Sequence, residues 1–310
     1  MRILRRYHDL DDDARGAAAA IGNFDGVHLG HQAVLDIARA EAARRGAPLG
    51  VLTFEPHPRQ VFAPDAPPFR LMNAATRAHR LDRLGVERLY EIPFDRDLIA
   101  LSPRDFAARV IAGGLGLSHV VVGRDFRFGK GRAGGGDDLA AFGAEMGFGV
   151  TVADLVRTAG QEISSTRIRE ALSAGDPGHA AEMLGHLHRV DGPVIRGERR
   201  GRTLGYPTAN MALDGLHLPR FGVYAVTVDI LTGPHAGTAT GVASLGVRPM
   251  FGENRPNLET YLFDFSGDLY GAELSVGLVA FLRPEERFDG VEALIRQMDA
   301  DSARARAVLA

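Results

Sequence analysis

The spacing of apolar residues changes near residue 186, and this change constrains the fold more than any other feature of the sequence. From Ala17 to about Leu172, short apolar runs alternate with segments of helical periodicity, which is typical of a parallel sheet covered by helices. Beyond residue 186, apolar and polar residues alternate between turns, which is typical of antiparallel strands. The chain has 310 residues, whereas single domains usually have about 100–200. We therefore predict two domains, residues 1–185 and residues 186–310.

The first domain is predicted to be a doubly wound, Rossmann-like α/β sheet. Its predicted strands are short apolar runs bounded by Gly, Pro or Asp, namely Ala18–Asn23, Leu49–Phe54, Arg88–Ile92, His119–Val122 and Val150–Leu155. The predicted helices are His31–Arg45, Ala74–Leu84, Pro103–Ala112, Leu139–Met146 and Thr166–Ala174. Ligands of such sheets bind where strands end and helices begin, so polar residues at these corners are the candidate site residues.

The second domain is predicted to be a closed antiparallel β-barrel followed by a helix. Four strands with turns between them are expected at Gly222–Asp229, Thr238–Gly246, Leu258–Phe265 and Glu273–Leu282. From Pro284 onward the pattern is helical, and one face carries Val291, Leu294, Ile295 and Met298. We expect this terminal helix to pack against the barrel.

Composition excludes several kinds of chemistry. The sequence has no cysteine, so it forms no disulfide, thiolate metal site, iron–sulfur cluster or cysteine nucleophile. Its single lysine, Lys130, lacks the following Ser or Thr of a P-loop, and a glycine-rich segment is a poor setting for a Schiff-base lysine. The run Gly129–Gly136 is either a mobile basic lid over nucleotide phosphates or a disordered connector.

Charge is balanced along the chain, with 23 basic and 24 acidic residues in 1–186 and 13 and 15 in 187–310. This balance argues against nucleic-acid binding. No stretch approaches the ~18 uninterrupted apolar residues of a membrane span. The N-terminus continues into Asp11–Asp13 rather than into the apolar core of a signal peptide. We expect a cytoplasmic protein that binds neither nucleic acid nor membrane.

The first strand-to-helix corner, Ile21–His31, is the most informative motif. A helix N-terminus offers unpaired backbone N–H groups and the positive end of a dipole to an anion. His28 and His31 are three residues apart, so they face the same way if the turn is helical, and Gly30 leaves room for a close approach. Such a pair can donate to phosphate oxygens in a transition state. Two plain surface histidines, or a metal pair without an evident third ligand, remain alternatives.

Two further segments carry phosphate-binding residue types. At Ile163–Arg169, Ser165 or Thr166 can cap a helix while Arg169, one turn further on, reaches the same anion. The first barrel loop, Gly197–Asn210, contains Gly201 and Arg202, which suit a phosphate. Thr208 and Asn210 project to the same side of a strand-like stretch, and their oxygens suit a hydrated Mg²⁺. Taken alone, the first segment would be a plain helix cap and the second an ordinary turn.

These motifs together resemble the bacterial bifunctional riboflavin kinase/FAD synthetases. Ile21–His31 resembles the HxGH signature of nucleotidyltransferases in the form found in that family, and Gly205–Asn210 resembles the riboflavin kinase signature. Three segments agree in order, Thr53–Pro58, Val122–Gly129 and Ile163–Arg169, and the run Leu258–Gly271 resembles the strand that carries the kinase's catalytic base. The resemblance implies Glu259 as that base, with His28 and His31 catalytic in the first domain. Implied nucleotide and phosphate contacts are Asn23, Asp25, Gly26, Gly30, Asp125, Ser165, Thr166, Arg169, Gly201, Arg202, Thr208 and Asn210, with Thr208 and Asn210 also on Mg²⁺.

The resemblance covers about residues 15–300 and implies two ATP-dependent, Mg²⁺-assisted reactions. Riboflavin is phosphorylated to FMN in the barrel, and FMN is adenylylated to FAD in the first domain with release of pyrophosphate. The sequence departs from the expected pattern at four positions: Arg77 where a lysine is expected, Ser244 where Asn is usual, Met250 where Thr is common and Tyr261 where His is frequent.

Two other functions keep part of this pattern. An adenylyltransferase of another phosphate ester, with the barrel as a flavin-binding module only, would keep the HxGH corner but has no use for Thr208, Asn210 and Glu259 together. A regulatory or RNA-binding flavin sensor is disfavoured by the near-neutral charge of both halves. We expect a monomer or a weak homo-oligomer.

Overall fold

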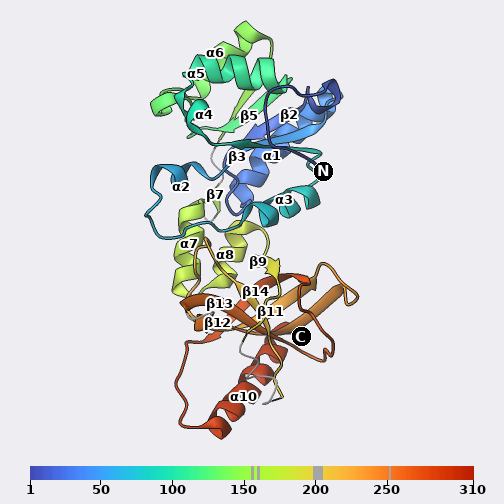
Figure 1. The fold of residues 1–310 in the computed structure, drawn as a ribbon. Coiled ribbons are helices and arrows are strands. Elements are labelled where there is room, and N and C mark those ends of the chain that lie inside the picture. The colour runs from blue at the N-terminus through green and yellow to red at the C-terminus, as the bar shows by residue number, and fades with distance from the viewer. Residues whose placement is uncertain (155–156, 159–160, 198–204, 251–252) are drawn as a thin grey trace. The chain divides into compact units, whose positions relative to one another are not determined.

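The computed structural model describes residues 1–154, 157–158, 161–197, 205–250 and 253–310, which form two compact units (Figure 1). The first unit comprises Met1–Pro67 and Arg77–Ile163. The second comprises Pro68–Thr76 and Ser164–Ala310. The chain therefore enters the second unit briefly before it completes the first, an excursion that the pattern of apolar residues does not indicate.

The first unit is built on a parallel six-stranded sheet in the order β1-β4-β3-β2-β5-β6. Its strands are β1 (Arg2–Leu4), β2 (Ala18–Ile21), β3 (Leu49–Glu55), β4 (Arg88–Pro93), β5 (His119–Gly123) and β6 (Gly149–Ala153), and a separate hairpin joins β7 (Arg157–Thr158) to β8 (Gln161–Glu162). The five predicted strands are present, and β1 is an additional edge strand. From β2 the chain builds the sheet outward through β3 and β4, and it then returns to add β5 on the other side of β2. The carboxyl ends of β2 and β5 therefore flank the topological switch point, where doubly wound sheets bind ligands.

Helices cover both faces of this sheet. Helix α1 (Leu29–Arg45) packs on β2, β3 and β5. On the other face, Ala19 and Ile21 of β2 share a core with Phe106 and Val110. These two belong to a π-helix, η2 (Phe106–Leu115), so the helix predicted at Pro103–Ala112 is α-helical only in α5 (Pro103–Asp105). The remaining helices are η1 (Asp12–Ala14), α2 (Pro58–Phe62), α3 (Ala74–Arg83), α4 (Arg96–Ala100), η3 (Lys130–Arg132) and α6 (Gly136–Met146).

The second unit contains a six-stranded antiparallel sheet in the order β10-β13-β12-β11-β14-β9. The strands are β9 (His188–Pro193), β10 (Ala209–Ala212), β11 (Gly222–Ile230), β12 (Gly237–Met250), β13 (Glu253–Leu262) and β14 (Glu273–Arg283). A bridge between Ile195 and Asn210, with Ile195 N donating to Asn210 O at 2.9 Å, joins the two ends of the sheet. The predicted barrel is therefore confirmed as a nearly closed one, and β9 and β10 are strands that the alternation did not single out.

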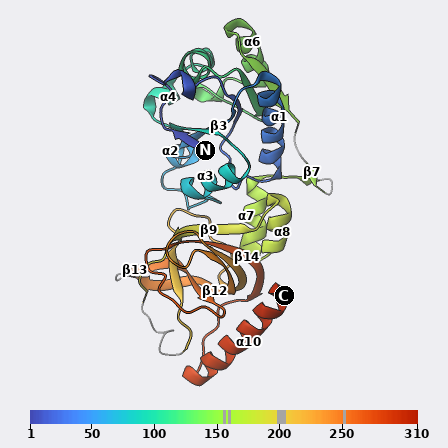
Figure 2. The same ribbon diagram turned by 90° about the vertical axis from the view of Figure 1, so that its right-hand side faces the viewer.

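Helices α7, α8 and α10 lie among the described residues of the second unit (Figure 2). Helix α7 (Ser165–Ala174) packs against α8 (Pro177–Leu184), which covers β9 and β14. The terminal helix α10 (Val291–Leu309) packs on β11, β12 and β14, as predicted. Asp301 of α10 is buried and binds Arg283 of β14. Its carboxylate accepts hydrogen bonds from Arg283 Nη2 at 2.7 Å and from Nε at 3.0 Å. The predicted apolar face is wrong at one residue, because Val291 at the first turn is 56% exposed.

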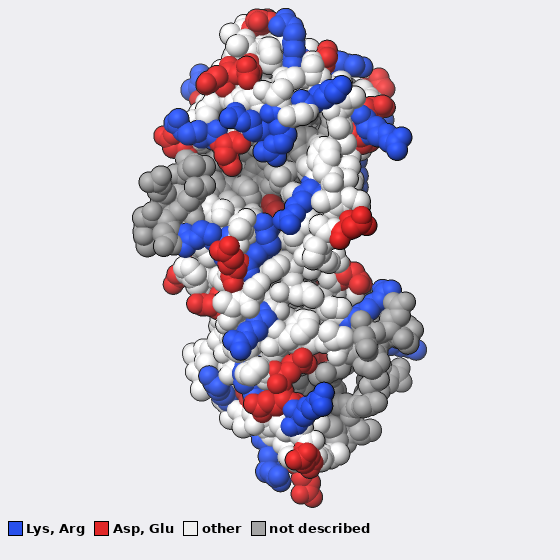
Figure 3. Space-filling view, turned by 90° about the vertical axis from the view of Figure 1, so that its left-hand side faces the viewer, with Lys and Arg blue, Asp and Glu red and all other residues white. Residues whose placement is uncertain are grey.

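Acidic and basic side chains are intermingled over each unit on the face shown in Figure 3. Within the described ranges, no helix combines the length and the apolar character that crossing a bilayer demands.

Candidate active sites

The first candidate site lies at the carboxyl end of β2, in the turn that leads into α1. His28 is the N-cap of α1, and its Nδ1 accepts a hydrogen bond from the backbone N–H of His31 at 3.3 Å. The two imidazoles are stacked, with centroids 3.7 Å apart and an interplanar angle of 15°. The predicted common orientation of His28 and His31 is therefore confirmed.

The contacts of this pair favour neutral imidazoles that donate through one nitrogen. Because Nδ1 of His28 accepts from the backbone, the neutral ring carries its proton on Nε2. Burial, and to a smaller extent His28, lower the pKa of His31 well below 6.5. Nδ1 of His31 is buried and has no hydrogen-bond partner in the described part of the chain. A neutral, desolvated histidine stabilises developing phosphate charge by donating a hydrogen bond rather than by carrying a full charge.

The backbone of this turn is in an unusual conformation. Phe24, Gly26 and Val27 have φ values of +52°, +87° and +43°, and a β-branched residue such as Val27 rarely adopts positive φ. Asp25 is buried, whereas the side chain of Asn23 is exposed. A Cβ at Gly30 would lie 3.1 Å from the His28 ring, so a side chain there would push the histidine aside. The structure thus brings Asn23, Asp25, Gly26, Gly30 and the histidine pair together in one turn.

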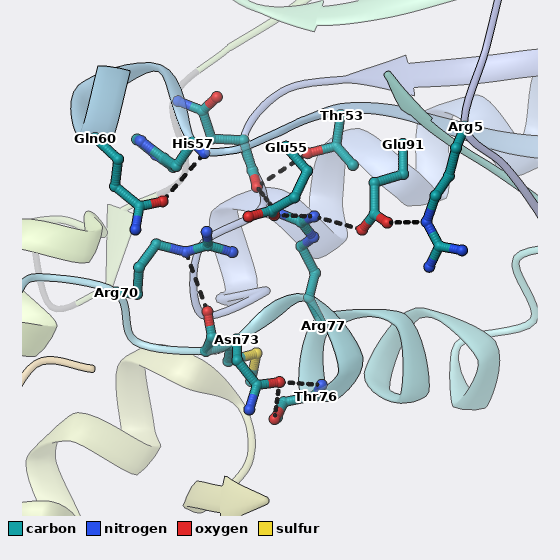
Figure 4. Close-up of polar contacts among 12 residues, drawn as sticks. Arg5, Thr53, Glu55, His57, Gln60, Arg70, Asn73, Thr76, Arg77 and Glu91 are labelled. Carbon is teal, nitrogen blue, oxygen red and sulfur yellow. Dashed lines mark hydrogen bonds and ion pairs between the residues drawn. The ribbon is translucent and has the colours of Figure 1, made fainter. Parts of the chain in front are cut away.

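A buried arginine, Arg77, links this turn to two carboxylates, those of Glu55 and Glu91 (Figure 4). Arg77 of α3 is fully buried, and its Nη2 lies 2.9 Å from both Glu55 at the end of β3 and Glu91 in β4. Nη1 of Arg77 donates to the backbone carbonyl of Asn23 at 3.4 Å, and Thr53 Oγ1 donates to the same oxygen at 3.2 Å. Arg77 was recognised in the sequence only as a departure, and the carboxylates that hold it were not identified, because nothing in the local pattern links strands β3 and β4 to this helix.

The loop after β5 carries the remaining candidates of the first unit. Asp125 is exposed, two residues beyond the end of β5. The glycine-rich run is a compact turn, in which Phe128 and Gly134 exchange two backbone hydrogen bonds of 3.0–3.1 Å and Lys130 N donates to Leu101 O at 2.7 Å. The disordered-connector alternative is therefore wrong, while the lid remains a prediction.

Ser165, Thr166 and Arg169 lie on α7, which belongs to the second unit. The helix cap is Ser164, whose Oγ accepts from Arg167 N at 3.4 Å, so the predicted cap at Ser165 or Thr166 is wrong by one or two residues. Arg169 donates to the carbonyl of Phe69 at 3.2 Å, and its guanidinium lies 5.8 Å from the Phe69 ring centroid. In this structure Arg169 therefore holds the segment Pro68–Thr76.

The second candidate site lies on neighbouring strands of the barrel. Asn210 of β10 is directly opposite Glu259 of β13, and Glu259 is opposite Ser244 of β12. Thr208 precedes β10, and its Oγ1 lies 3.5 Å from Nδ2 of Asn210. Residues opposite one another project to the same side of a sheet, so the ladder itself assembles the predicted kinase residues.

Asn257 is a residue of this cluster that the sequence interpretation missed. Its side chain is 2% exposed, and its Nδ2 donates to Asn210 Oδ1 at 3.1 Å and to Glu259 Oε1 at 3.3 Å. The sequence did contain the information needed to find Asn257, because this residue is two positions before Glu259 and so lies on the same face of the strand. Gly201 and Arg202 lie outside the described residues.

An aromatic and acidic group connects the signature segment to the terminal helix. Tyr206 donates a hydrogen bond to Asp299 of α10, and its ring centroid is 4.8 Å from that of Tyr261. Burial, with Asp299 as the next cause, raises the pKa of Tyr206 to about 12. Helix α10 thereby helps to define the position of the residues just before Thr208.

The barrel cluster has the donors that Mg²⁺ requires. The described residues contain no group of three His, Asp or Glu side chains placed to hold a metal. The cluster does offer oxygens of Thr208 and Asn210, and Oδ1 of buried Asn257 has no hydrogen-bond partner in the described part of the chain. A hydrated Mg²⁺ held mainly by nucleotide phosphates needs only such neutral oxygens from the protein.

Comparison with known proteins identifies the family of this chain. The family model described as FAD synthetase matches residues 10–167, and the model described as riboflavin kinase matches residues 184–309. A bifunctional riboflavin kinase/FMN adenylyltransferase of Pseudomonas fluorescens is 42% identical, over 100% of this chain and 98% of the relative. The chain belongs to the bifunctional riboflavin kinase/FMN adenylyltransferase family.

Other members and one solved structure extend the comparison. The bifunctional riboflavin kinase/FMN adenylyltransferase of Bacillus subtilis is 35% identical over 98% of this chain and 96% of its own. A crystal structure titled as a macrolide-efflux protein of Streptococcus pneumoniae matches with a TM-score of 0.84 and 31% identity, covering 98% of both chains. The two-part architecture found here is thus shared with that protein over nearly its whole length.

Proposed function

We propose that this chain carries both activities of its family, riboflavin phosphorylation and FMN adenylylation, and that each activity uses one of the two clusters described above. The observation that carries the proposal is the placement of Asn210, Asn257 and Glu259 in mutual contact on adjacent strands. A barrel that only bound flavin would need no carboxylate beside a phosphate-binding signature. An adenylyltransferase of another phosphate ester is therefore the weaker alternative.

In the kinase step, Glu259 accepts the proton of the ribityl 5′-hydroxyl as that oxygen attacks the γ-phosphorus of ATP and ADP leaves. The hydrogen bond from Asn257 to Oε1 sets the orientation of the carboxylate. Thr208 and Asn210 would hold the Mg²⁺ through their side-chain oxygens. When bound, Mg²⁺ neutralises the charge that develops on the phosphate oxygens.

In the adenylylation step, a phosphate oxygen of FMN attacks the α-phosphorus of ATP, and pyrophosphate leaves. His28 and His31 donate to oxygens of the reacting phosphates as their charge increases. The N-terminus of α1 adds backbone N–H groups at the same place. Asn23, Asp25, Gly26, Gly30 and Asp125 bind the nucleotide, and Ser165, Thr166 and Arg169 are further candidates for phosphate binding. No covalent enzyme intermediate is needed, in keeping with the absence of cysteine.

The domain assignment follows the two activities, with adenylylation in residues 1–185 and phosphorylation in residues 186–310. Gly201 and Arg202 would contact phosphate in the kinase site. We also propose that the enzyme works in the cytoplasm, as a monomer or a weak homo-oligomer, without nucleic-acid or membrane partners.

The direct test is to incubate the purified chain with riboflavin, ATP and MgCl₂ and to resolve riboflavin, FMN and FAD by chromatography. We expect FMN and then FAD, and no product when EDTA replaces the metal. A second reaction started from FMN isolates adenylylation. FAD from FMN without any FMN from riboflavin would support the alternative of an adenylyltransferase with a non-catalytic barrel.

A further inference from the structure

The turn that carries the histidine pair begins at the Asn23 carbonyl, which accepts hydrogen bonds from side chains. The last ladder contact of β2 on this side is Gly22 N to Leu52 O at 3.1 Å. The next carbonyl, that of Asn23, accepts instead from two side chains, Arg77 and Thr53. Immediately afterwards the chain enters the left-handed conformations of Phe24, Gly26 and Val27. Such conformations persist only where surrounding contacts impose them.

Arg77 is itself fixed by charge. Its guanidinium is fully buried between Glu55 and Glu91, at 2.9 Å from each, and Glu91 is only 4% exposed. An arginine fork can reach two carboxylates and a carbonyl at once, because its donors point in fixed, divergent directions. Donors from α3 and β3 thus converge on the Asn23 carbonyl, and carboxylates of β3 and β4 hold the arginine in place.

We infer that Arg77 is a positioning residue for FMN adenylylation. It holds the Asn23 carbonyl, and the turn that follows then keeps His28 and His31 in the positions that adenylylation needs. The inference rests on the proposed adenylylation activity of the first unit. In this role Arg77 does not contact the reacting phosphates. Its loss therefore lowers the turnover number more than it weakens substrate binding, because misplacement of a catalytic group by about 1 Å costs on the order of 100-fold.

The single variant Arg77→Met would leave the buried Glu91 carboxylate without its arginine partner from α3, which would destabilise the fold. A loss of activity in this variant could then come from lower stability as well as from misplaced histidines. The double variant Arg77→Met/Glu91→Gln removes both buried charges and leaves the Asn23 carbonyl without its arginine. Arg5→Met is the matched control, since Arg5 also binds Glu91, at 3.0 Å, but is 70% exposed and has no recorded bond to Asn23. Thr53→Val removes the second donor to the Asn23 carbonyl without any change of charge.

The experiment measures kcat and KM for FAD formation from FMN and ATP, riboflavin phosphorylation, and thermal unfolding for each variant. We expect a folded double variant to lose about 10- to 100-fold in adenylylation kcat, with KM for ATP and FMN changed by less than about threefold and with phosphorylation unchanged. Arg77→Lys should recover most of the kcat, Thr53→Val should show a smaller loss, and Arg5→Met should match the wild type.

Wild-type adenylylation in a folded double variant would overturn the inference, as would an equal loss in Arg5→Met. If the double variant fails to fold, the Thr53→Val variant provides the test. An unchanged adenylylation kcat in Thr53→Val would contradict the role of the Asn23 carbonyl in positioning the histidines. Failure of the wild-type chain to make FAD from FMN would instead contradict the proposed function, so the two failures are distinguishable.

Discussion

The histidine pair of the first unit lies in a turn that leaves a parallel strand, whereas Asn210, Glu259 and Ser244 of the second unit lie opposite one another on three antiparallel strands. The turn depends on side chains from β3 and α3 for its position. In the barrel, the backbone ladder places the carboxylate of Glu259 opposite Asn210, and Asn257 of the same strand donates to it. We expect the first site to be sensitive to substitutions outside it, and the second to be sensitive mainly to its own residues.

The largest expected effect is that of Glu259→Gln on the kinase. Glutamine retains the oxygen that accepts from Asn257 but cannot take the hydroxyl proton, so phosphorylation should fall by about 10²–10⁴-fold. FAD formation from supplied FMN should be unchanged. Chromatography of reactions started from riboflavin and from FMN measures both rates, and a comparable loss of adenylylation would mean that the two sites are not independent.

His28→Ala should lower FAD formation by about 10²–10³-fold, because it removes a transition-state donor together with the cap of α1. FMN should accumulate when the reaction starts from riboflavin. His8→Ala in the same unit is the control, since His8 is 68% exposed. Loss of both activities in His28→Ala would indicate misfolding rather than a catalytic defect.

A fragment of the second unit tests whether this part of the chain folds and phosphorylates riboflavin by itself. Gly185–Ala310 should phosphorylate riboflavin, but Ser164–Ala310 should be the more stable fragment because it retains α8. Met183 and Leu184 of α8 are buried, and burial of each such side chain contributes about 1.5–3 kcal/mol. We expect the longer fragment to melt about 10 °C higher or more by circular dichroism. Equal melting temperatures would show that α8 does not stabilise the barrel, and a folded but inactive Ser164–Ala310 would show that the kinase site needs residues that precede Ser164.

Acid should destabilise the second unit through His188. Burial, with smaller effects of His186 and His217, lowers the pKa of His188 to about 3. Between pH 3 and 6.5 the unfolded chain binds a proton that the folded chain does not, so the free energy of unfolding falls as pH falls, by up to about 1.4 kcal/mol per pH unit. Urea unfolding of Ser164–Ala310 at pH 5 and pH 7 should show this slope, and His188→Gln should reduce it while His179→Gln, on the surface, should not. An unchanged slope in His188→Gln would assign the acid sensitivity to other groups.

The smallest effect concerns the glycine-rich turn. If it covers the nucleotide phosphates, Lys130→Ala/Arg132→Ala should slow adenylylation about fivefold, the equivalent of roughly 1 kcal/mol for an exposed charged contact, and leave phosphorylation unchanged. Arg44→Ala, a surface change that removes only a pair with Glu41, is the control. Unchanged ATP dependence in the double variant would leave the turn with a structural role only.

The sequence predicted those features that depend on local periodicity and on contiguous motifs. The five parallel strands, the barrel, the terminal helix and the common orientation of His28 and His31 are of this kind. Asn257 could also have been found, because it shares a strand face with Glu259. The Arg77 pairing with Glu55 and Glu91 could not, since it joins residues 14 and 22 positions apart through tertiary packing. The membership of Pro68–Thr76 in the second unit likewise depends on contacts with Arg169 and His217, far along the chain.

That last feature has a consequence for synthesis of the protein. Arg70 pairs with Leu216 in a short bridge, and its carbonyl accepts from His217 N at 2.8 Å, so Arg70 finds these partners only after nearly 150 further residues have been made. Phe69 finds Arg169 only 100 residues later. At about 5–20 residues per second, the segment waits on the order of ten seconds or more at the ribosome. A nascent first unit must therefore keep this stretch available while the rest of its own sheet forms. The synthesis of this segment and the formation of its contacts are thus separated in time in this chain.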